Sequence, residues 1–165
     1  MGAASRIALV ALRVWQLICS IIVLGILARF LRVLSEAGAT RDGRVIYGVV
    51  IASISILFAI VFIAPFLYSF LPFPIDFALF IMWLVLFCLL ITRTGTNTCS
   101  SPWFWNYWGY YWGGWWRNPF SIINGPADIA YTGCGHWRTV LAFSFMAMFG
   151  FLVSACLVSF TIDRS

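Results

Sequence analysis

Four long runs of apolar residues, separated by polar or glycine-rich segments, organise this chain. They cover residues 7–34, 46–71, 75–92 and 139–162. A helix needs about 20 apolar residues to cross a bilayer, and each run is close to that length or longer. Because unpaired backbone groups are not tolerated in lipid, each run is predicted to be a helix. The pattern therefore predicts an all-α integral membrane protein, a bundle of four transmembrane helices with both termini on one side.

The three connections between these runs differ in length. Residues 35–44 form a short polar loop, and residues 69–74 are short enough for a tight turn between the second and third helices. Pro65, near the end of the second run, is expected to bend or end that helix. Residues 93–138 form the long connection, and loops of such length are usually functional or disordered.

The long connection contains the stretch PWFWNYWGYYWGGWW at residues 102–116. Aromatic rings with a polar edge are most stable at the headgroup level of a bilayer, and such a density of rings argues against disorder. We therefore predict an aromatic-rich loop that contacts lipid or mediates self-assembly. Its candidate residues are Trp103, Phe104, Trp105, Tyr107, Trp108, Tyr110, Tyr111, Trp112, Trp115 and Trp116.

Composition supports a membrane protein and not a soluble one. Of 165 residues, 63% are hydrophobic and 9% are charged, and the formal net charge is +5. The basic residues flank the apolar runs, so anionic lipid headgroups are expected as counter-ions and nucleic acid is not. The first run is longer than the apolar part of a signal peptide, which favours a retained helix over a cleaved one.

Two signals disagree about orientation. Seven arginines lie on the side of the long connection, and the positive-inside rule would place that side in the cytoplasm. Cys99 and Cys134, however, bracket the aromatic stretch. They could form a disulfide, which requires an oxidising side of the membrane, or remain two unpaired thiols.

The segment from Cys134 to Phe145, CGHWRTVLAFSF, resembles the entry to the fourth helix of fungal MARVEL-domain membrane proteins, and Pro74-Ile-Asp76-Phe77 is also similar to that family. The resemblance covers the span layout of residues 8–162. It implies cytoplasmic termini, an extracellular long loop, and a role in plasma-membrane microdomains or vesicle traffic; some fungal relatives are associated with membrane furrows called eisosomes. Together with the cysteines, it favours termini inside.

Two charges, Arg13 and Asp76, lie near the starts of predicted spans. Arg13 and Asp76 begin the first and third runs in the same leaflet, so they could form an intramembrane ion pair. Alternatively, Arg13 extends to the headgroups and Asp76 occupies the first turn of a helix, where the dipole favours an acid.

Small residues recur at helical spacing in the second and fourth runs, which permits close helix packing within one subunit or between two. These residues are Gly48, Ala52, Ser55, Ala59, Ala147, Gly150 and Ser154. Trp137 and Arg138 are expected to anchor the fourth helix at the headgroups.

Catalysis and metal binding have little support in the sequence. His136, the only histidine, has Cys134 nearby but no second pair of ligands at zinc spacing. There is no phosphate-binding glycine loop and no nucleophile with an orienting base, so an enzyme is not expected.

We therefore expect a non-enzymatic membrane-organising protein without a cofactor, apart from bound lipid or sterol. It would assemble laterally into homo-oligomers and contact lipids such as sterol or sphingolipid, shaping membrane domains or curvature or assisting traffic. A first alternative is a surface binding module whose aromatic loop holds cell-wall glycan or a partner protein. A second alternative is a small-solute transporter.

Overall fold

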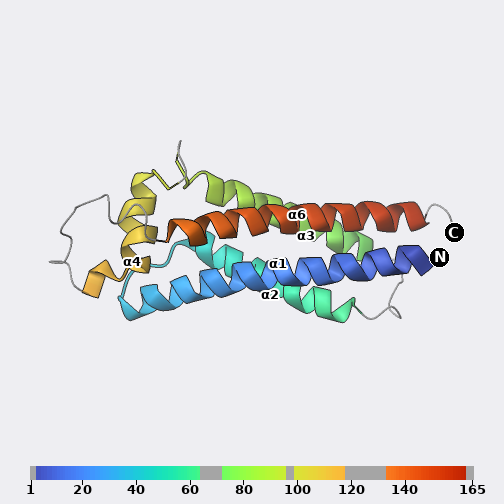
Figure 1. The fold of residues 1–165 in the computed structure, drawn as a ribbon, viewed down its shortest axis with the longest axis horizontal. Helices are drawn as coiled ribbons and strands as arrows, with labels where there is room; N and C mark the ends of the chain where they lie inside the picture. Colours follow the sequence, from blue (N-terminus) through green and yellow to red (C-terminus); the bar gives the residue numbers. More distant parts are fainter. Residues whose placement is uncertain (1–2, 64–71, 96–98, 118–132, 163–165) are drawn as a thin grey trace.

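The computed structural model describes residues 3–63, 72–95, 99–117 and 133–162, and its main feature is a bundle of four long helices (Figure 1). Each is long and apolar enough to cross a membrane. The all-helical architecture expected from the apolar runs is confirmed. The helices are α1 (Ala3–Glu36), α2 (Gly43–Val61), α3 (Pro72–Ile91) and α6 (Cys134–Ile162).

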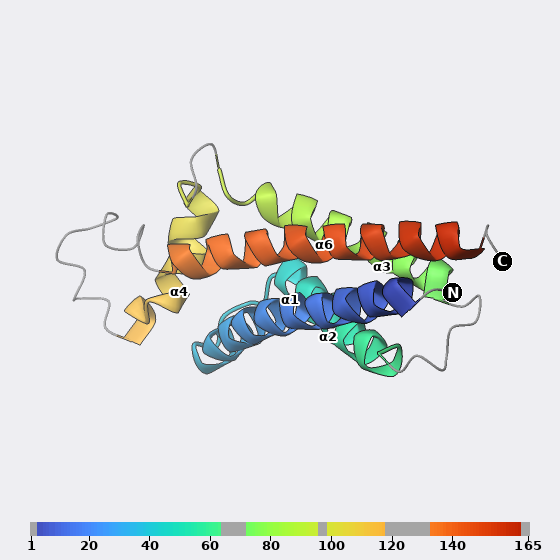
Figure 2. The ribbon, with the colours of Figure 1, turned by 45° about the vertical axis from the view of Figure 1, so that its right-hand side comes forward.

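The bundle has a distinct cap at one end. Helix α1 packs beside α2 and α6, α3 packs beside α6, and a smaller contact between α2 and α3 closes the ring. Both views show α1 beginning and α6 ending at the same end of the bundle, while short helical segments cover the opposite end (Figures 1 and 2).

The helix boundaries differ from the predicted ones. Helix α2 begins at Gly43 because the Asp42 carboxylate accepts a hydrogen bond from the Arg44 backbone N–H at 3.0 Å, and it ends at Val61, well short of residue 71. Pro65 and the first part of the predicted turn at 69–74 lie outside the described residues. Helix α3 starts at Pro72, since proline is tolerated in a first turn where N–H groups have no intrahelical partner.

The region predicted as one long loop, residues 93–138, is largely helical where it is described. Its last part, from Cys134, already belongs to α6. Residues 102–117, which we call the aromatic cap, form the π-helical segment η2 (Phe104–Gly109), the short helix α4 (Tyr110–Trp112) and the 3-10 turn η3 (Trp115–Arg117).

Local signals explain why the aromatic cap is helical. Ser101 precedes it, and its hydroxyl accepts a hydrogen bond from the Phe104 N–H at 3.1 Å, while Pro102 occupies the first helical position. Gly114 lies between α4 and η3 with a φ of 71°, a left-handed conformation that favours glycine. The sequence SSPW therefore contains a helix-start signal, although the length of the connection alone indicates a loop.

The bundle interior is packed by large side chains against small ones. Near the middle, the buried Trp83 donates its indole N–H to the Ser55 hydroxyl at 2.9 Å. A Cβ atom added at Gly48 would lie 2.6 Å from Leu27 Cδ1, so glycine lets α2 approach α1. The predicted packing residues of α2 and α6 thus face the inside of one subunit; Gly48, Ala52, Ser55, Ala59, Ala147, Gly150 and Ser154 are all buried.

The outer faces of the helices carry large apolar side chains. Exposed examples are Ile18 on α1, Leu57 on α2, Phe77 on α3 and Phe149 on α6. A surface of this kind is stable in lipid and not in water. The chain is therefore an integral membrane protein.

Candidate functional site

The first candidate site is a buried polar cluster near the end of the bundle that holds both chain ends. Arg13 on α1 and Asp76 on α3 form a two-pronged ion pair, with Nη1 to Oδ1 at 2.6 Å and Nη2 to Oδ2 at 2.7 Å. Their side chains are only 2% and 0% exposed. Charges in such a place need each other, because neither can be hydrated.

Further hydrogen bonds complete this cluster and connect it to α6. The Gln16 side chain accepts from Arg13 at 2.9 Å and donates to the Gly150 carbonyl at 3.1 Å. The Ser154 hydroxyl donates to Asp76 Oδ2 at 2.8 Å. The Arg13 guanidinium also lies 5.1 Å from the centre of the Phe58 ring of α2. Four helices therefore meet at one ion pair.

The second candidate site is the aromatic cap, which is built around Trp108. This side chain is fully buried, and its ring centroid lies 4.3 Å from Phe30 of α1 and 4.8 Å from Trp137 of α6. The Trp112 ring stacks on it with an interplanar angle of 8°. Its indole N–H donates to the Gly133 carbonyl at 3.1 Å. The cap is thus part of the protein core and not a free loop.

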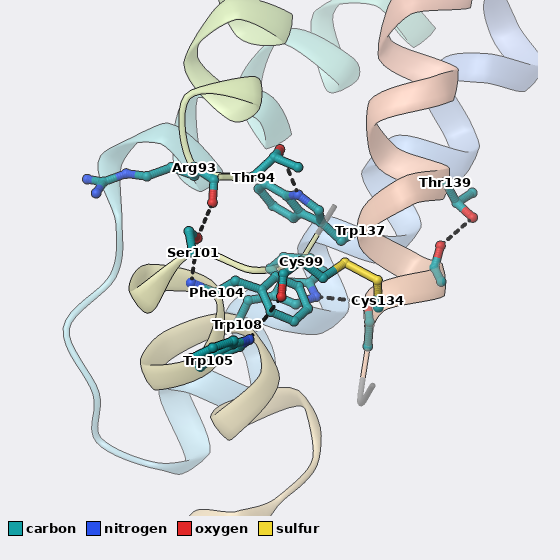
Figure 3. The surroundings of a disulfide bond; sticks show 12 residues. Arg93, Thr94, Cys99, Ser101, Phe104, Trp105, Trp108, Cys134, Trp137 and Thr139 are labelled. Carbon is teal, nitrogen blue, oxygen red and sulfur yellow. Dashed lines mark hydrogen bonds between the residues drawn. A yellow bond between two sulfur atoms is a disulfide. The ribbon is translucent and has the colours of Figure 1, made fainter. Parts of the chain in front are cut away.

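A disulfide fixes the aromatic cap to the first residue of α6. Cys99 and Cys134 are bonded, with Cα atoms 5.9 Å apart and a separation of 35 residues in sequence (Figure 3). Beside it, the Trp105 N–H donates to the Cys99 carbonyl at 2.9 Å, and the Trp137 N–H donates to the Thr94 hydroxyl at 3.2 Å. The indole N–H groups of Trp105, Trp108 and Trp137 therefore each have an acceptor, as buried polar groups usually do. The indole nitrogens of Trp115 and Trp116 are also buried, but they have no hydrogen-bond partner among the described residues.

The aromatic cap also holds the short loop between α1 and α2. The Tyr107 hydroxyl donates to the Thr40 carbonyl at 2.6 Å and accepts from the Asp42 N–H at 3.0 Å. Burial raises the pKa of Tyr107 above its ordinary value, so the hydroxyl stays protonated and able to donate. The Arg117 guanidinium adds an ion pair with Glu36 at 3.0 Å.

The ten aromatic residues predicted to form a contact surface are all at least partly buried. Phe104 and Trp108 are buried, and the other eight, from Trp103 to Trp116, are half-buried. Arginine side chains cover ring faces of Trp103, Trp112 and Trp116. The outer surface of the cap therefore combines half-buried rings with arginines that lie over three of them.

One predicted role needs correction. Trp137 was expected to anchor α6 in the headgroups, but its side chain is fully buried beneath the cap because Trp103, Phe104 and Trp108 surround it. Arg138, the other predicted anchor, is exposed. His136 is also exposed, with its ring 4.6 Å from that of Trp112.

Sequence reasoning missed several residues of both sites. Gln16 lies one helical turn after Arg13, and a polar amide at that spacing inside an apolar run was the available signal. Phe30 offered none, since an aromatic residue between two arginines resembles any interface residue. In the described part of the chain, no group of three His, Cys, Asp or Glu residues could hold a metal ion.

The fold and these two sites define a class, the four-span helical membrane proteins with a folded segment between the third and fourth spans. Residues 6–157 match the model of the MARVEL membrane-associating domain. The match covers most of the chain, which therefore belongs to the MARVEL family. Neither the curated proteins nor the solved structures gave a match.

The ion pair predicts strong thermodynamic coupling between Arg13 and Asp76. Arg13→Gln and Asp76→Asn should each lower the free energy of unfolding by about 3–5 kcal/mol, because each leaves a buried charge without its partner. The double variant should lose far less than the sum of both. Denaturation of the purified protein in detergent micelles measures all three values.

Ser159→Ala is the matched control for this cycle, since its hydroxyl donates to the Ala155 carbonyl within α6. It should leave the free energy of unfolding nearly unchanged. Strictly additive losses for Arg13→Gln and Asp76→Asn would show that the two charges do not stabilise each other.

The disulfide predicts that Cys99→Ser and Cys134→Ser each lower stability. A closed loop of 35 residues corresponds to about 4 kcal/mol in the chain-entropy account of cross-links. Thermal unfolding with and without reductant should show the same loss for either variant and for the reduced protein. The exposed free cysteines provide controls, because Cys88→Ser and Cys156→Ser should not change the effect of reductant. An unchanged unfolding temperature on reduction contradicts the prediction.

A comparison of Gly133→Ala with Gly114→Ala tests the packing of the aromatic cap separately from backbone strain. Gly133 and Gly114 both have positive φ, but an added Cβ at Gly133 would lie 2.9 Å from the Trp112 ring, whereas Gly114 has open space. Gly133→Ala should therefore cost more than the roughly 1–2 kcal/mol of a left-handed alanine, which Gly114→Ala should show alone. Equal losses in thermal unfolding would mean that the Trp112 contact is not tight.

Proposed function

We propose that this protein organises membranes without catalysis, by assembling laterally with copies of itself and by contacting lipids. The observation that carries the proposal is the position of the aromatic cap. A rigid layer of half-buried aromatic side chains covers one end of a bundle whose sides are apolar. Aromatic side chains at one interface increase the cross-sectional area of the protein in that leaflet alone. This difference between leaflets changes lipid packing and favours curvature.

The orientation we propose places the cap outside the cell and the termini in the cytoplasm, in the plasma membrane. The Cys99–Cys134 bond supports this choice, since disulfides persist in oxidising compartments. The seven arginines on the side of the cap favour the opposite orientation under the positive-inside rule, but several of them have structural roles within the protein. Arg44 donates to the Leu89 carbonyl at the end of α3, and Arg32 and Arg117 pair with Glu36.

The two alternative functions receive less support from the geometry. A glycan-binding platform needs open ring faces, whereas the faces of Trp103, Trp108 and Trp112 contact other rings or arginines. A transporter needs polar groups along a path through the bundle. The middle of this bundle is instead closed by Trp83 and the cap end by Trp108 and Trp137, all fully buried.

Membership of the MARVEL family supports the same general role, and the resemblance to fungal relatives suggests a specific place for it. Within the proposal, the protein acts in plasma-membrane furrows of the eisosome type or in the traffic that supplies them. Its partners would be further copies of the chain and sterol- or sphingolipid-rich bilayers. Apolar faces on all four helices give such copies a surface to meet on.

Reconstitution into vesicles tests this function. Copies labelled with donor and acceptor dyes should show energy transfer above that of random mixing, and vesicles with the cap on the outer side should become more curved. Reduction of the disulfide should weaken both effects, because it loosens the cap that adds cross-section to one leaflet. Randomly distributed monomers in flat vesicles would contradict the proposal.

A further inference from the structure

Four arginines in this structure lie over an aromatic ring, and two of them differ from the others. Arg13 is paired with Asp76, and Arg117 is paired with Glu36. Arg29 lies 5.4 Å from the centre of the Trp112 ring and Arg93 5.6 Å from that of Trp103. In the described ranges neither forms an ion pair with a carboxylate. A guanidinium that lies over an indole ring and has no carboxylate partner can still donate two N–H groups to an acceptor with two oxygens, such as a phosphate.

The depth of both arginines matches the headgroup plane. On α1, Ile7 is 70% exposed near the chain start, and the helical rise puts Arg29 about 33 Å from it. On α3, Phe73 is exposed, and the same rise puts Ile91, the last residue of the helix and two residues before Arg93, about 27 Å away. The hydrocarbon core of a bilayer is about 30 Å thick, so both guanidinium groups reach the phosphates of one leaflet.

The charge around this end of the bundle is positive. Its arginines in the described residues are Arg29, Arg32, Arg41, Arg44, Arg93, Arg117 and Arg138. The acids are Glu36, which accepts from Arg32 and Arg117, and Asp42, which caps α2. No described carboxylate is left to neutralise Arg29 or Arg93, so their counter-charge must come from outside the described residues.

The rings beneath the two arginines are held in place by the protein core. Trp112 stacks on the buried Trp108, and Trp103 contacts the buried Trp137. His136 adds a second polar ring next to Trp112. The Nε atom of Arg93 is buried without a hydrogen-bond partner, and Figure 3 shows this side chain directed away from the disulfide. Both guanidinium groups are therefore preorganised, which lowers the cost of binding.

The geometry points to two phospholipid headgroup sites, one at Arg29 on Trp112 and one at Arg93 on Trp103. In each, the guanidinium donates two hydrogen bonds to the phosphate, and the lipid chains lie against the apolar faces below. The sites are on diagonal helices, so they would hold lipids on two sides of one bundle. This inference rests on the lipid contact of the proposed function and specifies its chemical class, the phosphate-bearing lipids.

Native mass spectrometry of the full chain in detergent tests this assignment. Phosphatidic acid should be retained with at least about tenfold higher affinity than diacylglycerol, which has the same chains and no phosphate. Arg29→Gln and Arg93→Gln should each remove one retained lipid, and the double variant should remove both. Arg29→Lys and Arg93→Lys should bind more weakly than the wild type, because a single ammonium cannot form the two-pronged contact.

Arg32→Gln and Arg41→Gln are the matched controls, since both arginines are exposed at the same end and neither lies over an aromatic ring of the described residues. They should retain phosphatidic acid as the wild type does. Equal retention of phosphatidic acid and diacylglycerol, or undiminished retention by the double variant, would overturn the assignment. So would displacement of the lipid by millimolar inorganic phosphate, which would identify a site for the free ion.

Energy transfer between labelled copies of the double variant separates this inference from the proposed function. If the wild type assembles laterally but does not prefer phosphatidic acid to diacylglycerol, the headgroup sites are wrong and the proposed function still holds. If the wild type prefers phosphatidic acid but its copies do not assemble, the proposed function is wrong and the headgroup sites still hold. Thermal unfolding of each variant shows whether it is folded. If Arg93→Gln unfolds, the Arg29 variants and Arg93→Lys decide the outcome.

Discussion

The ion pair between Arg13 and Asp76 is the constraint on which the arrangement of the helices depends. Neither charge can be hydrated within a lipid-surrounded bundle, so each orientation of α1 that separated them would leave two buried charges unpaired. Gln16 and Ser154 occupy remaining hydrogen-bonding positions around the pair and bring α6 to it. Apolar packing alone would tolerate many rotations of these helices, because their outer and inner faces are both hydrophobic; the polar cluster selects one.

The aromatic cap solves a related problem at the other end of the bundle. Backbone N–H and C=O groups beyond the end of a membrane helix need hydrogen-bond partners, and side chains of the cap provide some of them. The Tyr107 hydroxyl hydrogen-bonds with the backbone of the α1–α2 loop, and the Trp108 indole N–H donates to the Gly133 carbonyl. The Ser101 hydroxyl donates to the Arg93 carbonyl just after α3 and accepts from the Phe104 N–H. Tryptophan and tyrosine suit this position because one residue provides both a large apolar ring and a hydrogen-bonding group. The disulfide then fixes the cap against α6.

The sequence predicted the parts of this structure that depend on hydrophobicity averaged over about 20 residues. Four apolar runs define the spans, and the bracketing of the aromatic stretch by Cys99 and Cys134 made their disulfide a reasonable hypothesis. It did not predict that residues 102–117 fold inward, because a run of tryptophans looks alike whether its rings face lipid or one another. The signal for helix was local, in Ser101 and Pro102, and the direction of the rings depends on Phe30 and Trp137 from distant segments.

Taken together, the two ends of the bundle are stabilised by different chemistry, and this difference bears on function. The end with the termini is fixed by charges hidden from lipid, so its described ion pair offers nothing to the surrounding leaflet. At the capped end, by contrast, arginines and half-buried aromatic rings lie at the surface. In the arrangement proposed above, lipids in one leaflet contact a positively charged rim, and lipids in the other contact apolar helices. Within the proposed function, this difference between the two leaflets favours lipid sorting or bending of the bilayer, and the disulfide-bonded cap keeps the difference fixed.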